Sequence, residues 1–410
     1  MYNCSLEGMC PSKSIVKDKQ QTSAFKKSIV VTSVDSINLK TDPLSAKPAK
    51  MAVSLLRAAL NGESYSGNAL KGATEADWRA MAEIVGQSSV SAIITEALPP
   101  DEIKNIPFDV LKELYEFRYI AEDQYRKQEL NLKEISTFLN RKGIDTIQLK
   151  GLGLSMLYPH PELRVGCDVD IFTRKKGSET LSRSNSGDAV DQMMLDAGLK
   201  VEHYGNPNAK HSEFEYKGTI FENHKFFVNK EKLKHSKLVD ELLHKLLNPQ
   251  ETTLSGGTKI LTPSKEFNTL FLAHHSLQHY IFGGLDLHNL ADWSMHIRKY
   301  GLNLPKEVKG TKFEEFINAL TNVSNRVLGT NIPVPENKEY ENDILEKILH
   351  PERHSPTKDM NKFEILLFKV RRNLEISKKS KAFGGENPTK ILIKTVLEKI
   401  HDIPALFRPF

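Results

Sequence analysis

Two aspartates separated by one residue are the feature of this sequence that points most directly to chemistry. Asp168 and Asp170 flank Val169 and precede the apolar pair Ile171-Phe172. Alternate side chains of a strand share a face, so the two carboxylates are expected to point the same way. Two negative charges this close repel each other unless a cation lies between them. The pattern therefore predicts a divalent metal held by oxygen ligands.

A third acid lies on a nearby predicted strand. In residues 220–224 the alternation places Glu222 and His224 on one face, opposite Phe221. A neighbouring strand could bring Glu222 beside the aspartates. Three carboxylates around two metal ions about 3.5–4 Å apart can activate a hydroxyl nucleophile and neutralise a departing pyrophosphate. The alternative is that Glu222 lies on an exposed hairpin face.

A glycine-containing turn precedes the aspartates. Residues 144–149 are predicted to form a buried strand and residues 150–158 a helix, with Gly151 and Gly153 at the junction. The free N–H groups at the start of a helix attract phosphate. The turn is therefore a candidate phosphate-binding element.

Two basic side chains near this turn are candidate counterions for phosphate. Arg164 could bind a phosphate through two nitrogens, whereas Lys150 would act as a point charge. The alternative is that each pairs with a nearby acid such as Glu162.

Three histidines, His274, His275 and His279, share one predicted helix. Positions i and i+4 lie on the same helix face, as in a zinc site. No glutamate lies between His275 and His279 as in a metalloprotease helix, so a helix that lines the substrate cleft, or simple packing, is favoured. Asp292 is expected to be structural and to accept a hydrogen bond beneath the site.

The order and spacing of several short motifs resemble the uncharacterised nucleotidyltransferase family, within the polymerase-beta-like nucleotidyltransferase superfamily. The resemblance spans roughly residues 75–300. The motifs are Lys150-Gly151, Tyr158-Pro159-His160-Pro161, Leu163-Arg164, Asp168-Val169-Asp170, Glu222-Asn223-His224 and Leu290-Ala291-Asp292-Trp293. One departure is that the usual Gly-Ser pair after the first strand is here Lys150-Gly151, with Ser155 four residues further on.

The resemblance implies a nucleoside triphosphate as co-substrate and Mg²⁺ or Mn²⁺ as cofactor. By this analogy, Asp168 and Asp170 hold metal, and Glu222 is the third carboxylate that binds metal and orients or deprotonates the acceptor. The predicted substrate- and phosphate-binding residues are Lys150, Gly151, Gly153, Ser155, Arg164 and His224.

The expected fold is α+β, a polymerase-beta-like mixed sheet flanked by N- and C-terminal helical subdomains. The predicted segments are a disordered leader (1–50), a helical N-terminal subdomain (51–140), a nucleotidyltransferase catalytic core (141–230), a helical subdomain completing the cleft (231–335) and a basic helical C-terminal region (336–410). Elements predicted in the core after the aspartates are a mobile loop (174–188), a helix (189–197), a strand (199–203) and a hairpin (213–216 with 219–227). After about residue 233 only helices are expected, among them 285–297, 363–370 and 391–400.

Charge is unevenly distributed along the chain. The net charge is +5, but residues 1–50 carry +4 and residues 351–410 carry +6, which leaves −5 for residues 51–350. An acidic core does not favour a nucleic-acid partner, although the basic ends could contact RNA. No apolar run approaches the ~20 residues of a membrane helix. The first 20 residues lack the apolar core of a secretory signal, so the cytoplasm is the expected compartment.

These observations together predict a nucleotidyltransferase. It would move a nucleoside monophosphate from a nucleoside triphosphate to a hydroxyl or amine of an unknown small-molecule or protein acceptor. Two alternatives stay open: a catalytically inactive nucleotide- or partner-binding protein of the same fold, and a metal-dependent phosphohydrolase built on the same acids.

Overall fold

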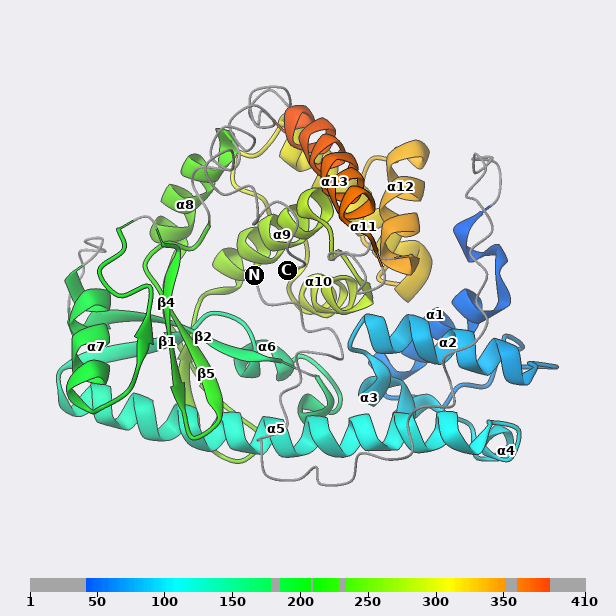
Figure 1. The fold of residues 1–410 in the computed structure, drawn as a ribbon, viewed down its shortest axis with the longest axis horizontal. Helices are drawn as coiled ribbons and strands as arrows, with labels where there is room; N and C mark the ends of the chain where they lie inside the picture. The colour runs from blue at the N-terminus through cyan, green and yellow to red at the C-terminus, as the bar shows by residue number, and fades with distance from the viewer. Residues whose placement is uncertain are drawn as a thin grey trace.

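The structure is a computed structural model, and it describes residues 42–164, 166–177, 185–207, 209–228, 234–350 and 360–383. These residues form one mixed sheet with helices around it, which confirms the α+β class (Figure 1). The leader prediction for residues 1–41 and the helix at 391–400 lie outside the described residues. The helix α1 begins at Lys47, inside the segment predicted to be disordered.

The sheet has seven strands in the order β3-β4-β5-β2-β1-β7-β6. Their bounds are β1 (Ile144–Gln148), β2 (Asp168–Lys175), β3 (Val201–Glu202), β4 (His211–Tyr216), β5 (Thr219–His224), β6 (Gln250–Thr253) and β7 (Lys259–Thr262). The pairs β2 with β5 and β1 with β7 are parallel, and the others are antiparallel.

Helices make up most of the rest. The α-helices of the described residues are α1 (Lys47–Leu60), α2 (Glu75–Gln87), α3 (Ser91–Ile94), α4 (Pro100–Ile103), α5 (Phe108–Arg141), α6 (Leu152–Ser155), α7 (Asn185–Asp196), α8 (Lys234–Leu246), α9 (Lys265–Phe282), α10 (Leu287–Tyr300), α11 (Lys312–Leu328), α12 (Lys338–Leu349) and α13 (Lys362–Ala382). Short 3₁₀ helices are η1 (Pro43–Ser45), η2 (Thr95–Ala97) and η3 (Pro161–Leu163). None of the described helices is both long and apolar enough to cross a bilayer.

The two faces of the central strands differ in chemistry. Val169, Ile171 and Phe221 point to one face and join a small hydrophobic core. The side chains between them therefore point to the opposite face. This alternation places Asp170 and Glu222 on the face away from that small core.

The long helix α5 links two parts of the molecule. Its C-terminal half packs on the sheet through Leu132, Ile135 and Leu139, which belong to the small core. Its N-terminal half contributes Val110 and Leu114 to the larger helical core. In Figure 1 it runs along one whole side, under both α1–α3 and the sheet.

Three sequence predictions about individual elements were wrong. The helix expected over residues 150–158 is only the four-residue α6, because the chain enters η3 soon afterwards. A second hairpin, β6–β7, lies where only helices were expected. The expected loop at 174–188 is shorter, since β2 continues to Lys175 and α7 begins at Asn185. Residues 178–184 lie outside the described residues.

Candidate active site

The three acidic residues meet at the centre of the sheet. Asp168 and Asp170 lie on β2, and Glu222 lies on the adjacent parallel strand β5, directly opposite Asp170. The Asp168 carboxyl lies within hydrogen-bonding range of Glu222. Asp170 is 1% exposed, and the Glu222 side chain is 16% exposed. The sequence pattern and the pairing of the strands thus bring all three carboxylates together.

The environments of the carboxylates differ. Burial, together with the charge of Asp170, raises the pKa of Asp168 to about 7. Burial would also raise the pKa of Asp170, but the Lys150 ammonium and a hydrogen bond with His224 hold it below the usual range. Burial is likewise outweighed at Glu222, where hydrogen bonds with His211 and His224 hold the pKa low. Asp168 is therefore the carboxyl that titrates near neutral pH.

Two lysines face the acids. Lys150 Nζ lies 3.2 Å from Asp170 Oδ2, and the charges of Asp170 and Asp168 raise its pKa although burial would lower it. Burial lowers the pKa of Lys210, although the charges of the same acids would raise it. The charged forms of both lysines would attract a phosphate that approached the carboxylates.

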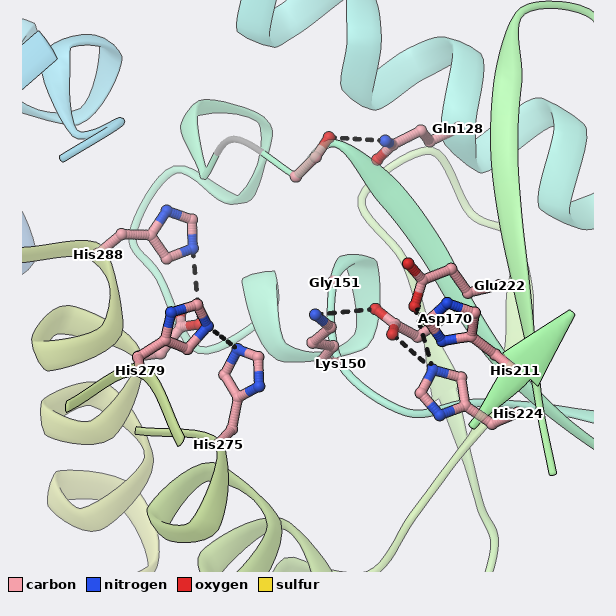
Figure 2. Close-up of polar contacts among 12 residues, drawn as sticks. Gln128, Lys150, Gly151, Asp170, His211, Glu222, His224, His275, His279 and His288 are labelled. Carbon is pink, nitrogen blue, oxygen red and sulfur yellow. Dashed lines mark hydrogen bonds and ion pairs between the residues drawn. The ribbon is translucent and has the colours of Figure 1, made fainter. Parts of the chain in front are cut away.

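Two histidines surround Glu222 (Figure 2). His224 Nε2 lies 2.8 Å from Asp170 Oδ1 and 3.5 Å from Glu222 Oε2. His211 Nδ1 lies 3.0 Å from Glu222 Oε2. The predicted shared face of Glu222 and His224 therefore exists, and His224 contacts carboxylates of both strands.

Two of the groups predicted to bind phosphate donate their hydrogen bonds to other parts of the protein. Ser155 is buried, and its hydroxyl donates to the carbonyl of Leu152 at 2.7 Å. The Gly153 N–H donates to the side chain of Gln148 at 2.6 Å. Gly151 has a φ of +66°, a value that favours glycine at the turn before α6. The glycines thus shape the turn, and the structure does not bring the Ser155 hydroxyl into the site.

Arg164 is used in a buried ion pair. Its Nε and Nη2 donate to the two oxygens of Asp292 at 2.7 and 2.6 Å, and the Tyr158 hydroxyl donates to Asp292 Oδ1 at 2.6 Å. Pairing with an acid was the alternative interpretation for Arg164, although the partner is Asp292 and not Glu162. Asp292 has the structural role that the sequence predicted.

The histidines of α9 point in different directions. His274 is buried, lies against Phe313 and has its Nε2 3.4 Å from Ser236 Oγ, so it is a packing residue. His275 and His279 approach each other, with their Nε2 atoms 3.1 Å apart. Burial and the charges of neighbouring groups, Lys150 among them, lower the pKa of His275. Figure 2 shows His275 on the side of Lys150 away from Asp170.

Glutamines of α5 position the segment before β2. The side chains of Gln124 and Gln128 donate to the carbonyl of Gly166 at 2.6 and 2.7 Å. Gly166 lies two residues before Asp168 in the chain. Helix α5 therefore helps to fix the start of the strand that carries the aspartates.

Sequence reasoning missed two residues at the site, Lys210 and His211. His211 had a detectable signal, because a hairpin was already expected around the two-residue turn Lys217-Gly218. A hairpin centred there pairs His211 with His224, as the structure has it. Lys210 lies just before the strand and has no comparable signal.

The donor set fits a divalent cation. Among the described residues, Asp170 Oδ2 is buried without a hydrogen-bond partner of good geometry, and its neighbour is a cation, the Lys150 ammonium. The carboxylates of Asp168, Asp170 and Glu222 supply the oxygen ligands that Mg²⁺ prefers. The three carboxylates are thus of the ligand type that the predicted metal requires.

Comparisons with known proteins give a family. A family model described as an uncharacterised nucleotidyltransferase matches residues 74–320, more than half of the chain. Comparison with curated proteins gave no match. Among solved structures, the chain is similar to an antigenic nucleotidyltransferase-like protein from Paracoccidioides brasiliensis. That similarity has 14% identity and a TM-score of 0.33, over 50% of this chain and 94% of the other.

Proposed function

Because the chain belongs to the uncharacterised nucleotidyltransferase family, we propose that it transfers a nucleoside monophosphate from a nucleoside triphosphate to a hydroxyl or amine of an acceptor. The acceptor would be a small molecule or a protein. The proposed catalytic core is residues 141–230, with residues 231–335 completing the cleft.

The observation that carries this proposal is the convergence of three carboxylates from adjacent strands. Asp170 and Glu222 are paired in register, and Asp168 reaches Glu222. Packed against each other without a cation, three ionised carboxylates repel strongly. In the proposal, Asp168, Asp170 and Glu222 hold Mg²⁺ or Mn²⁺, and the bound metal neutralises charge on the phosphates and on the departing pyrophosphate.

The basic residues have a separate role in this proposal. Lys150 and Lys210 provide positive charge next to the acids, where the triphosphate would lie. Lys150 would then exchange its ion pair with Asp170 for a contact with phosphate. Fixed charges in a buried site stabilise developing negative charge without reorganising at the moment of reaction.

Glu222 is the proposed group that orients or deprotonates the acceptor. Its carboxylate is held by His211 and His224, so its position is defined before any substrate binds. A positioned carboxylate next to the α-phosphate would favour in-line attack by the acceptor, and such positioning accounts for much of the rate in group transfer.

The test is a transfer assay with the Asp170→Asn variant. The purified chain is incubated with ATP, GTP, CTP or UTP labelled at the α-phosphate, with Mg²⁺ or Mn²⁺ and a metabolite extract. The wild type should attach label to an acceptor. Asp170→Asn should reduce transfer by about a hundredfold or more, since it removes a buried charge at the reacting centre. Circular dichroism should show that the fold is retained.

An exposed aspartate on α4 serves as the matched control. Asp101→Asn should leave transfer unchanged. Retained transfer in Asp170→Asn would contradict the mechanism. Nucleotide binding by the wild type without turnover would favour the inactive alternative, and release of phosphate or pyrophosphate without labelled acceptor would favour the phosphohydrolase.

A further inference from the structure

The two histidines beside Glu222 form a compact group with it. His211 and His224 face each other across the β4–β5 hairpin. One ligand atom from each of His211, Glu222 and His224 lies within 4.8 Å of the other two. The His224 side chain is fully buried, and the His211 side chain is 24% exposed. Two imidazoles and a carboxylate therefore converge on one small volume.

A contact with a backbone carbonyl fixes the orientation of the His224 ring. Its Nδ1 lies 3.2 Å from the carbonyl oxygen of Phe226. A carbonyl only accepts hydrogen bonds, so Nδ1 carries a proton, and in the neutral ring Nε2 then carries the lone pair. Metal-binding histidines commonly donate their second ring N–H to a backbone carbonyl in this way.

His224 Nε2 is aimed at two carboxylates. It faces Asp170 Oδ1 at 2.8 Å and Glu222 Oε2 at 3.5 Å. Ionised carboxylates are acceptors only. A proton or a metal ion must therefore lie between the imidazole nitrogen and the two carboxylate oxygens. Burial would lower the pKa of His224, but hydrogen bonds with Asp170 and Glu222 raise it, so a proton fills this place in the absence of metal. A metal ion can replace that proton, since these three groups are its ordinary ligands.

The spacing of the ligand atoms also fits. Ligand atoms about 2.0–2.1 Å from a tetrahedral Zn²⁺ are about 3.3 Å apart. The contacts of Glu222 Oε2 with His211 Nδ1 and His224 Nε2 are 3.0 and 3.5 Å, and the contact of His224 Nε2 with Asp170 Oδ1 is 2.8 Å. Small side-chain adjustments would bring the atoms of His211, Glu222 and His224 onto one ion, and Asp170 Oδ1 lies beside His224.

We propose that His211, Glu222 and His224 bind a divalent transition-metal ion such as Zn²⁺, with Asp170 as the fourth ligand. Imidazole nitrogen suits Zn²⁺, whereas Mg²⁺ takes oxygen ligands. This inference goes beyond the proposed function, because the ion needs no nucleotide and no transfer reaction in order to bind. The site shares Asp170 and Glu222 with the proposed Mg²⁺ site, so the two ions would be neighbours.

The experiment measures metal binding to the full chain without nucleotide. Isothermal titration with Zn²⁺ should give one tight site, and Co²⁺ in its place should give the visible absorption of an imidazole-bound ion. His211→Ala should weaken Zn²⁺ binding at least about tenfold and abolish the Co²⁺ band. It should weaken Mg²⁺ binding less than Zn²⁺ binding, since His211 contacts the ligand Glu222 but is itself no ligand for an oxygen-preferring ion.

The second pair of histidines provides the matched control. His275→Ala alters a histidine whose Nε2 is 3.1 Å from another ring nitrogen, and it should retain wild-type Zn²⁺ affinity. Equal Zn²⁺ affinity in wild type and His211→Ala would overturn the proposal, as would loss of binding in His275→Ala only. A chain that binds Zn²⁺ as expected but transfers no nucleotide would contradict the proposed function and leave this inference standing.

Discussion

Asp168 and Glu222 are neighbouring carboxyl groups with opposite properties. Burial and the charge of Asp170 raise the pKa of Asp168 to about 7, while contacts with two histidines hold the pKa of Glu222 low despite its burial. Groups whose environments move their pKa values apart are typical of catalytic sites. At neutral pH the site therefore keeps Glu222 ionised, and Asp168 is poised to lose its proton when a cation binds.

The activity should depend on pH through Asp168. Below about pH 7 this carboxyl is protonated and neutral, so it binds metal poorly, and above that pH it is ionised. We therefore expect kcat/KM for the nucleoside triphosphate to rise as pH increases through about 7 at low Mg²⁺. Initial rates of label transfer across this range would measure it.

Metal concentration provides the control for this pH profile. Because Mg²⁺ competes with the proton for Asp168, raising Mg²⁺ should move the midpoint to lower pH. A profile that is flat across neutral pH, or a midpoint that does not respond to Mg²⁺, would show that Asp168 is not a ligand.

At the level of single residues, the sequence predicted the acids better than the phosphate-binding groups. Strand alternation alone placed Asp168 with Asp170 and Glu222 with His224, because that periodicity is independent of the rest of the fold. Arg164 and Ser155 could not be assigned in this way. Their hydrogen bonds are with Asp292, far along the chain, and with a backbone carbonyl. Only the tertiary structure determines which acceptor each of these donors contacts.

Among the elements, the turn after α6 and the helix α10 are joined by one buried contact. Arg164 follows η3, and Asp292 lies on α10, and both are less than 10% exposed. The contact has two nitrogen–oxygen hydrogen bonds, and Tyr158 adds a third. This arrangement ties the loop between β1 and β2 to helix α10.

Breaking this contact should destabilise the protein strongly. Arg164→Met leaves Asp292 buried without its main cation, and loss of one partner of a buried ion pair costs about 3–5 kcal/mol. Urea denaturation followed by circular dichroism would measure the free energy of unfolding.

An exposed ion pair provides the control for the Arg164→Met variant. Arg79 pairs with Asp109 at the surface, with half of its side chain exposed, so Arg79→Met should change stability little. Equal stabilities of the Arg164→Met variant and the wild type would show that the contact does not hold these elements together.

The elements that the sequence predicted well have strong periodicity. The β4–β5 hairpin was expected because apolar alternation flanks Lys217-Gly218. The β6–β7 hairpin was missed because β6 is the polar, largely exposed edge strand Gln250–Thr253 and carries no apolar alternation. It forms because β7 pairs with β1, which is a long-range contact. The boundaries of the five predicted segments stay predictions.

On the scale of the whole molecule, helices form a large core next to a small core behind the sheet. The larger core includes residues of α1, α9, α10 and α11, and the small one lies between the sheet, α5 and α7. The buried histidines belong mostly to the helical part. His296 on α10 is fully buried, and its Nε2 lies 2.8 Å from the Thr269 hydroxyl of α9.

Burial of His296 should make the fold sensitive to acid. Burial lowers its pKa to about 4, whereas an unfolded histidine titrates near 6.5. Between these two pH values His296 is protonated in the unfolded state and neutral in the folded state. The free energy of unfolding therefore decreases as pH falls from about 6.5 to about 4. This loss amounts to about 3 kcal/mol, and denaturant unfolding at several pH values would detect it.

Two variants test the assignment of this acid sensitivity to His296. His296→Gln removes the titrating group while keeping an N–H for Thr269, so its stability should fall less than that of the wild type below about pH 6.5. His350→Gln, at an exposed position, should follow the wild type. Parallel pH profiles for His296→Gln and the wild type would contradict the explanation.

In the proposed mechanism, Asp168, Asp170 and Glu222 together hold a divalent metal on which a nucleoside triphosphate binds. Anomalous diffraction from crystals grown with Mn²⁺ and a non-hydrolysable triphosphate analogue tests it most directly. We expect an anomalous peak within about 2.3 Å of oxygens from all three carboxylates, with the triphosphate beside Lys150. A peak elsewhere, or a bound analogue with no metal at these carboxylates, would contradict it.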